Sequence, residues 1–115
     1  MTLRIYHNPR CSKSRATLEL LRQHGVEPEI VKYLETPPDR ATLEALAAAL
    51  GGAAELVRSG EAAYRELGLD AATPESALLD AIVEQPILLQ RPIVVCGDRA
   101  AIGRPPENVL QLIGD

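Results

Sequence analysis

A cysteine surrounded by basic residues is the strongest chemical signal in the sequence. Cys11 follows Pro9 and has Arg10, Lys13 and Arg15 as neighbours. Where a helix begins, unpaired backbone N–H groups and the positive end of the helix dipole favour a thiolate. Such surroundings lower the pKa of a cysteine from ~8.5 to roughly 3.5–7.5, and cations rarely crowd a cysteine that packs in an apolar core. The pattern therefore predicts a nucleophilic thiolate at Cys11.

The segments on either side of this cysteine predict a βαβ unit. Residues 3–6 are typical of a short strand, residues 12–24 of a helix that ends at Gly25, and residues 29–33 of a second strand. The second strand is expected to run parallel to the first. Cys11 then lies in the first turn of the helix, at the junction with the first strand.

The middle of the chain favours helices. Residues 41–50 are rich in Ala and Leu and are followed by Gly51, and residues 53–90 are predicted to be wholly helical. Thr73-Pro74-Glu75 predicts the start of a helix, with Thr73 as its N-cap, that ends at Pro86. The side chains expected to be buried on this helix are Leu78, Leu79, Ile82 and Val83.

The C-terminal segments predict a β-hairpin followed by a helix. Residues 92–96 give the strongest strand pattern, Gly97-Asp98 a turn and residues 100–102 a returning strand. Pro105-Pro106-Glu107 opens a final helix with Val109, Leu110 and Ile113 on one face. The whole order predicts an α/β fold with a thioredoxin-like mixed sheet of about four strands. The 115 residues predict a single domain, 1–115, with a helical insertion at about 39–90.

Composition excludes several classes of function. A net charge of −4 argues against a general nucleic-acid or anionic-membrane surface, and no apolar stretch reaches the ~20 residues of a membrane span. The first residues do not resemble a signal peptide. Two cysteines far apart in sequence do not suggest a disulfide scaffold, so a reducing cytoplasm is expected. Two histidines and two cysteines match no metal-ligand spacing, so no metal site is predicted.

The residues after Cys11 exclude two kinds of cysteine site. Ser14 occupies the position where a C-x-x-C redox pair would need its second cysteine, and Thr17 the position where a C-x5-R oxyanion loop would need arginine. Cations that hold an oxyanion must therefore come from elsewhere in the fold. The candidates are Arg58, Arg91 and Arg104. Topology favours Arg91, because in a thioredoxin-like sheet the loop before this strand faces the start of the cysteine-bearing helix. Cys96, within a strand, is expected to be a packing residue.

Several motifs together resemble one family, the glutaredoxin-coupled arsenate reductases. The resemblance covers essentially the whole chain, and with its end at Asp115 the sequence is more similar to the short chromosomal members. The motifs are His7-Asn8-Pro9-Arg10-Cys11 with Ser14-Arg15, Tyr33-Leu34-Glu35-Thr36-Pro37-Pro38, Tyr64-Arg65-Glu66-Leu67-Gly68-Leu69, Gln90-Arg91-Pro92-Ile93-Val94-Val95 and Arg104-Pro105-Pro106-Glu107.

This resemblance implies a reaction and a set of site residues. It implies that arsenate is reduced to arsenite through a thiol–arsenate adduct on Cys11, which glutathione as co-substrate and glutaredoxin as partner resolve. No bound cofactor is expected, and the protein is expected to be a monomer. Arg58, Arg91 and Arg104 are implied to bind the oxyanion, and His7 to tune the thiolate. The implied supporting residues are Asn8, Ser14, Arg15 and Pro92, the last with a cis peptide bond.

Two other functions stay open at this point. A monothiol glutathione-dependent oxidoreductase without arsenate activity would use Cys11 and the same sheet, but it would not need three convergent arginines. A non-catalytic thioredoxin-fold regulator that binds RNA polymerase would share the helical insertion. Such regulators usually carry a C-x-x-C switch, which the serine at position 14 rules out here.

Overall fold

A computed structural model describes residues 2–113, which fall into two units. The first unit comprises residues 2–36 and 91–113, and the second residues 37–90. The second unit covers the predicted insertion, while the assignment of residues 1–115 to one domain stays a prediction. Among residues 2–113, no helix has the length and apolar character that crossing a membrane requires.

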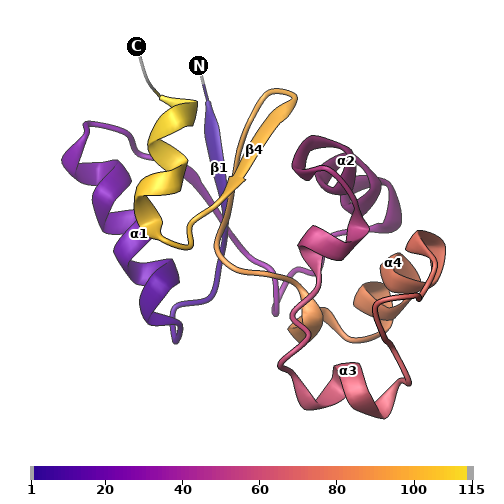
Figure 1. Cartoon of the computed structure of the whole chain (residues 1–115). Coiled ribbons are helices and arrows are strands. Elements are labelled where there is room, and N and C mark those ends of the chain that lie inside the picture. The colour runs from indigo at the N-terminus through magenta and orange to yellow at the C-terminus, as the bar shows by residue number, and fades with distance from the viewer. Residues whose placement is uncertain (1, 114–115) are drawn as a thin grey trace. The chain divides into compact units, whose positions relative to one another are not determined.

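A four-stranded mixed sheet forms the frame of the first unit (Figure 1). The strands are β1 (Leu3–His7), β2 (Glu29–Lys32), β3 (Ile93–Cys96) and β4 (Arg99–Ile102), in the spatial order β2-β1-β3-β4. β1 pairs in parallel with β2, while β3 is antiparallel to both of its neighbours. The βαβ unit, the hairpin and the thioredoxin-like sheet are therefore confirmed.

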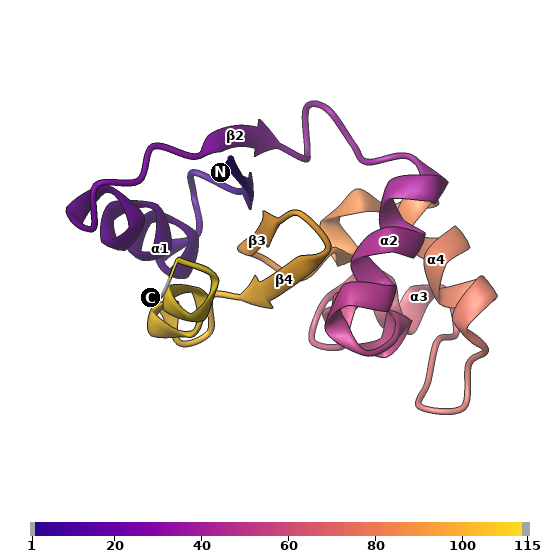
Figure 2. The ribbon, with the colours of Figure 1, turned by 90° about the horizontal axis from the view of Figure 1, so that it is seen from above.

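The core of the first unit lies between one face of this sheet and two helices. α1 (Ser12–Gln23) and the 3-10 helix η3 (Pro106–Leu112) run side by side over that face in both views (Figures 1 and 2). Alternate strand residues face them, as the two-residue period of a strand requires. The buried core residues are Leu3, Ile5, Leu18, Leu21, Val94, Cys96, Ala101, Val109 and Leu112. Cys96 is only 8% exposed, so the prediction that it packs in the core is confirmed.

The second unit consists of short helices. They are α2 (Arg40–Leu50), η1 (Ala53–Leu56), α3 (Ala62–Glu66), α4 (Glu75–Glu84) and η2 (Pro86–Leu88). Asp39 is the N-cap of α2, and its carboxylate accepts the Thr42 N–H at 2.8 Å. This hydrogen bond also lowers the pKa of Asp39. α2 ends at Gly51, which adopts the left-handed backbone (φ 96°) that favours glycine.

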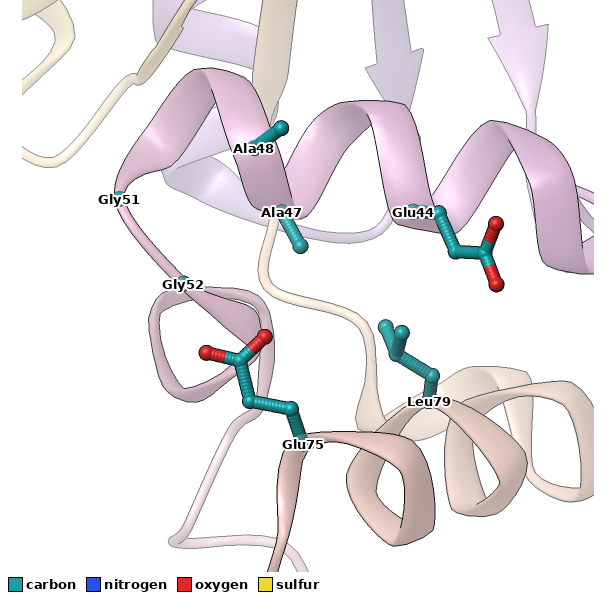
Figure 3. A pocket seen from close by; sticks show the side chains of 7 residues that line it. All are labelled: Glu44, Ala47, Ala48, Gly51, Gly52, Glu75 and Leu79. Carbon is teal, nitrogen blue, oxygen red and sulfur yellow. The ribbon is translucent and has the colours of Figure 1, made fainter.

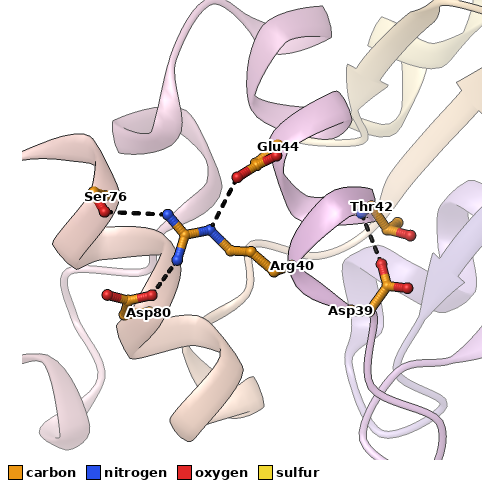
Figure 4. Close-up of polar contacts among 6 residues, drawn as sticks. All are labelled: Asp39, Arg40, Thr42, Glu44, Ser76 and Asp80. Carbon is orange, nitrogen blue, oxygen red and sulfur yellow. Dashed lines mark hydrogen bonds and ion pairs between the residues drawn. The ribbon is translucent and has the colours of Figure 1, made fainter.

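Arg40 ties α2 to α4 within this unit (Figure 4). Its guanidinium pairs with the Asp80 carboxylate and donates to the Ser76 hydroxyl at 3.2 Å. Its Nε also lies 3.3 Å from a carboxylate oxygen of Glu44, one turn along α2. The Arg40 side chain thus contacts three partners and holds α2 and α4 together.

The prediction of continuous helix over residues 53–90 is wrong. Val57 and Leu89 form an antiparallel β-bridge, so the chain is extended at both points. Thr73 does not cap α4, because its hydroxyl accepts the Asp70 N–H at 2.8 Å in a local turn. Pro74 is the N-cap instead.

Two further details differ from the sequence patterns. Val83 is 48% exposed rather than buried on α4. The final helix is a 3-10 helix, in which residues three apart lie on one line, and this brings Val109 and Leu112 into the core. The apolar spacing of this segment suits either type of helix, so the pattern alone did not distinguish them.

Candidate active site

The topology of the sheet brings four separate segments of the first unit to one edge. β1 and β2 are parallel and His7 pairs with Lys32 at their ends, so Asn8 and Tyr33 follow next to each other. β3 runs antiparallel to β1, with Ile93 opposite Tyr6, so β3 starts at this same edge. β4 ends there as well, because Ile102 pairs with Ile93. The chemistry-bearing residues at this edge are Cys11, Tyr33, Arg91 and Arg104.

Cys11 is the N-cap of α1, one position before the predicted first turn. Its backbone is extended (φ −94°, ψ 123°), its N–H donates to the Asn8 carbonyl at 2.9 Å and its own carbonyl accepts the Arg15 N–H at 3.0 Å. An N-cap side chain points at the unpaired N–H groups of the first turn. The sulfur of Cys11 therefore occupies the place where a helix best stabilises a negative charge.

The surroundings of the sulfur lower its pKa. Burial of the thiol raises the pKa, but hydrogen bonds from the backbone N–H groups of Ser14 and Lys13 and from the Arg91 side chain oppose this effect. The positive charge of Arg104 adds to them, and the net shift is downward. The half-buried Cys11 sulfur is thus both accessible and biased toward thiolate, as a nucleophile requires.

Arg104 is the cation that contacts the sulfur most clearly. Its Nη2 lies 3.4 Å from the Cys11 sulfur, and its Nε donates to the Arg91 carbonyl at 2.7 Å. One planar guanidinium therefore connects the thiol with the segment that carries the second arginine. The peptide bonds Arg91–Pro92 and Arg104–Pro105 are both cis, which confirms the expected cis Pro92.

Gly103 lets the Arg104 segment approach α1 closely. Its N–H donates to the Pro92 carbonyl at 3.0 Å, and its carbonyl accepts from the Thr17 hydroxyl at 3.4 Å. A Cβ atom at this position would lie 2.8 Å from Cγ of Pro92 and would also collide with the Thr17 hydroxyl. Only glycine leaves room for this packing, so Gly103 determines where Arg104 lies.

We expect Gly103→Ala to destabilise the fold and to raise the pKa of Cys11. The added methyl group must push the 103–105 segment away from Thr17 and Pro92, which costs about 1–3 kcal/mol of unfolding free energy. Arg104 moves with this segment, so its charge no longer lowers the pKa of the thiol. Denaturant unfolding and the pH profile of Cys11 alkylation measure the two effects. Gly60→Ala is the control, because nothing lies within 4 Å of its would-be Cβ; equal behaviour of the two variants would contradict the argument.

His7 reaches the cysteine through Ser14. The His7 Nδ1 lies 2.7 Å from the Ser14 hydroxyl, which also accepts the Asn8 N–H at 3.0 Å. Burial lowers the pKa of His7, and the positive charges of Lys32, Arg22 and Arg15 lower it further, so the neutral imidazole is favoured. The ring thereby holds Ser14, whose backbone N–H is one of the groups that lower the pKa of Cys11. That His7 tunes the thiolate, through Ser14 and not by direct contact, stays a prediction.

The remaining basic residues of the motif brace the loop or face solvent. Arg15 is exposed and donates to the Pro9 carbonyl at 2.9 Å, while the Asn8 side chain accepts the Arg10 N–H at 3.0 Å. These contacts hold the turn between β1 and α1. Arg10 and Lys13 are exposed to solvent.

Arg58, the third predicted arginine, belongs to the second unit. Its Nη1 lies 3.7 Å from a Glu61 carboxylate oxygen, and its N–H donates to the Leu88 carbonyl at 2.8 Å. Its role in binding an oxyanion stays a prediction. One groove within the second unit, of about 340 Å³, does not suit an anion, because the Glu44 and Glu75 carboxylates line it (Figure 3).

The chain has close matches among known proteins, and they span both units. Residues 6–112 match the ArsC family. The chain belongs to the ArsC family. The arsenate reductase of Neisseria meningitidis serogroup A is 49% identical over 110 residues, which cover 93% of this chain and 94% of that protein. The solved arsenate reductase of Vibrio cholerae aligns with a TM-score of 0.92 and 47% identity over 97% of this chain and 98% of that one.

A relative without an assigned activity is similar over the same length. The uncharacterized protein YfgD of Escherichia coli K12 is 56% identical over 115 residues, covering 97% of each chain. The resemblance deduced from the sequence motifs and the thioredoxin-like fold are both confirmed for this ArsC protein.

Tyr33 belongs to a motif that carries the family resemblance, Tyr33-Leu34-Glu35-Thr36-Pro37-Pro38, but the sequence predicts no role at the site for it. It is fully buried and follows β2 directly, one position beyond the last pair of the parallel ladder, His7 with Lys32. The sequence pattern assigned it to the second strand, where a buried aromatic residue is ordinary. The signal that could have found it is the parallel pairing itself, because the residue after β2 must lie beside the residue after β1.

Proposed function

We propose that this ArsC protein reduces arsenate to arsenite. The observation that supports this most directly is the contact of 3.4 Å between Arg104 Nη2 and a Cys11 sulfur whose pKa is lowered. A tetrahedral oxyanion needs a guanidinium that holds its oxygens and a thiolate that attacks its centre, and both are placed together here. The relatives from Neisseria meningitidis and Vibrio cholerae that are named arsenate reductase support the choice of arsenate.

In the first step the Cys11 thiolate attacks the arsenic atom of bound arsenate. A sulfur–arsenic bond forms, an oxygen leaves as water, and arsenic stays pentavalent. The N–H groups at the start of α1 and the guanidiniums of Arg91 and Arg104 bind the oxygens on which negative charge builds up. The proton that the leaving oxygen needs comes from the arsenate itself or from water.

In the second step glutathione attacks the Cys11 sulfur. A sulfur–sulfur bond forms and the sulfur–arsenic bond breaks toward arsenic, which gains two electrons and leaves as arsenite. The two thiols are oxidised to a mixed disulfide between Cys11 and glutathione. Glutaredoxin then takes over the glutathionyl group by thiol–disulfide exchange and returns Cys11 to the thiol.

The reductant must come from outside because the second cysteine is not available. Cys96 is buried in the core under α1 and η3. It cannot attack the adduct without unfolding of the first unit. Since both external thiols are maintained in reducing compartments, we place the enzyme in the cytoplasm.

The test is a coupled assay with arsenate, glutathione, glutaredoxin, glutathione reductase and NADPH. We expect one NADPH to be consumed for each arsenite formed, and both rates to fall to background when glutathione is left out. A protein that forms no arsenite in the full system, but reduces a glutathione mixed disulfide when glutaredoxin is left out, would instead be a monothiol oxidoreductase. That result would overturn the proposal.

A further inference from the structure

The hydroxyl of Tyr33 is a buried polar group that needs an explanation. The side chain is completely inaccessible to solvent, and within residues 2–113 its hydroxyl makes no hydrogen bond of regular geometry. A buried donor or acceptor without a partner destabilises a fold, and native proteins rarely keep one. A phenylalanine would fill the same space without this penalty. The hydroxyl therefore suggests a partner that is present only during function.

The groups around the hydroxyl are those of the candidate active site. Burial raises the pKa of Tyr33, the positive charge of Arg91 and the nearby polar side chains of Asn8 and Arg91 oppose this effect, and Cys11 raises the pKa further. Tyr33 thus lies near the thiol, near the second arginine and near the loop between β1 and α1. The net shift is upward, so the phenol stays protonated and can donate at neutral pH.

An oxyanion at Cys11 would supply the acceptor that is missing. A tetrahedral anion brings several oxygens into a site where Arg91 and Arg104 are charged donors. Every other polar group described around the hydroxyl, the Asn8 amide and the Arg91 guanidinium, belongs to the same edge of the sheet. We propose that the Tyr33 hydroxyl is a third donor to the bound oxyanion, beside Arg91 and Arg104. This inference rests on the proposed function, because it assumes that an oxyanion binds next to Cys11.

A neutral donor has a distinct use in such a site. Each added arginine repels the others when the site is empty, whereas a phenol adds a hydrogen bond without adding charge. Its rigid ring, fixed by burial, also keeps the donor in position before the anion arrives, so little freedom is lost on binding. Tyr33 therefore helps to select an anion that directs an oxygen at its hydroxyl.

The experiment measures anion binding separately from turnover. Iodoacetamide alkylates Cys11, and a bound anion slows that reaction, so the anion concentration that halves the rate gives the binding constant. Sulfate is the first probe, because it binds without forming a bond to sulfur, and arsenate is the second. For Tyr33→Phe we expect both anions to protect about ten- to hundred-fold less well, the loss expected for one hydrogen bond to a charged group.

The matched control is Tyr6→Phe, which removes a buried phenol hydroxyl that interacts with Arg4 on β1. Protection by sulfate should be unchanged in this variant. The pH profile of alkylation without anion should be unchanged in Tyr33→Phe, because Tyr33 is not among the groups that shift the pKa of Cys11.

Three outcomes would overturn the proposal, and they differ in meaning. If the pH profile of Tyr33→Phe moves upward, Tyr33 only positions Arg91, whose hydrogen bond lowers the pKa of the thiol. If protection is the same in Tyr33→Phe and in the unmodified protein, the hydroxyl does not contact the anion. If neither anion protects the unmodified protein, the oxyanion site itself is absent and the proposed function fails with it.

Discussion

Replacing Cys11 with serine will abolish arsenate reduction. A serine hydroxyl stays protonated in the surroundings that favour a thiolate, and it cannot form the mixed disulfide from which glutaredoxin regenerates the enzyme. Loss of the nucleophile costs roughly a thousand-fold or more in turnover in enzymes that form covalent intermediates. In the coupled assay we therefore expect NADPH consumption of Cys11→Ser at the rate of the reaction without protein.

The same thiol should react with iodoacetamide at unusually low pH. The lowered pKa means that thiolate is present below the pH at which a free cysteine ionises, and it is lost only as the pH falls through the folded-state pKa. Cys96→Ala is the matched control, because it removes the buried cysteine and leaves the reactive one. Its alkylation and turnover should equal those of the unmodified protein. Alkylation of Cys96 at the rate of Cys11 in the native protein would contradict the assignment.

The sequence was sufficient to predict the elements that position Cys11. A short apolar strand, Pro9, a basic turn and a helix ended by Gly25 follow each other closely enough that local rules decide each of them. The hairpin at Gly97 is equally local, and this glycine adopts φ 62° as the turn requires. The pairing of β3 with β1 joins distant parts of the chain, so it follows from the thioredoxin-like order of all the elements rather than from a local rule.

The second unit could not be predicted as well because its turns depend on competing local contacts. Threonine is a favoured N-cap residue, but the Thr73 hydroxyl accepts the backbone N–H of Asp70 instead of an N–H group of α4. The bridge between Val57 and Leu89 joins residues that are distant in the chain, so no local sequence pattern predicts it. Similarly, the role suggested for Tyr33 depends on the pairing of His7 with Lys32, a property of the register rather than of either strand alone.

Replacing Arg104 with alanine should weaken both binding and nucleophile activation. The variant loses the guanidinium that lies 3.4 Å from the Cys11 sulfur and the Nε donor that holds the Arg91 carbonyl at 2.7 Å. One hydrogen bond to a charged group is worth about 1.5–3 kcal/mol, so kcat/KM for arsenate should fall by about one to two decades. The pKa of Cys11 should also rise, since Arg104 is one of the groups that lower it.

The variant Arg104→Lys distinguishes the effect of the positive charge at this position from the effect of the guanidinium geometry. An ammonium group restores the positive charge near the thiolate, but a single nitrogen cannot reach the sulfur and the Arg91 carbonyl in the fixed directions of a guanidinium. We therefore expect Arg104→Lys to recover most of the low Cys11 pKa and only part of kcat/KM. Arg99→Ala is the matched control, because it removes the same positive charge as Arg104→Ala. Arg99 is exposed on β4 and donates to the Gln111 carbonyl at 2.8 Å. If Arg99→Ala lowered kcat/KM as much as Arg104→Ala, net charge rather than the contact with Cys11 would govern the reaction.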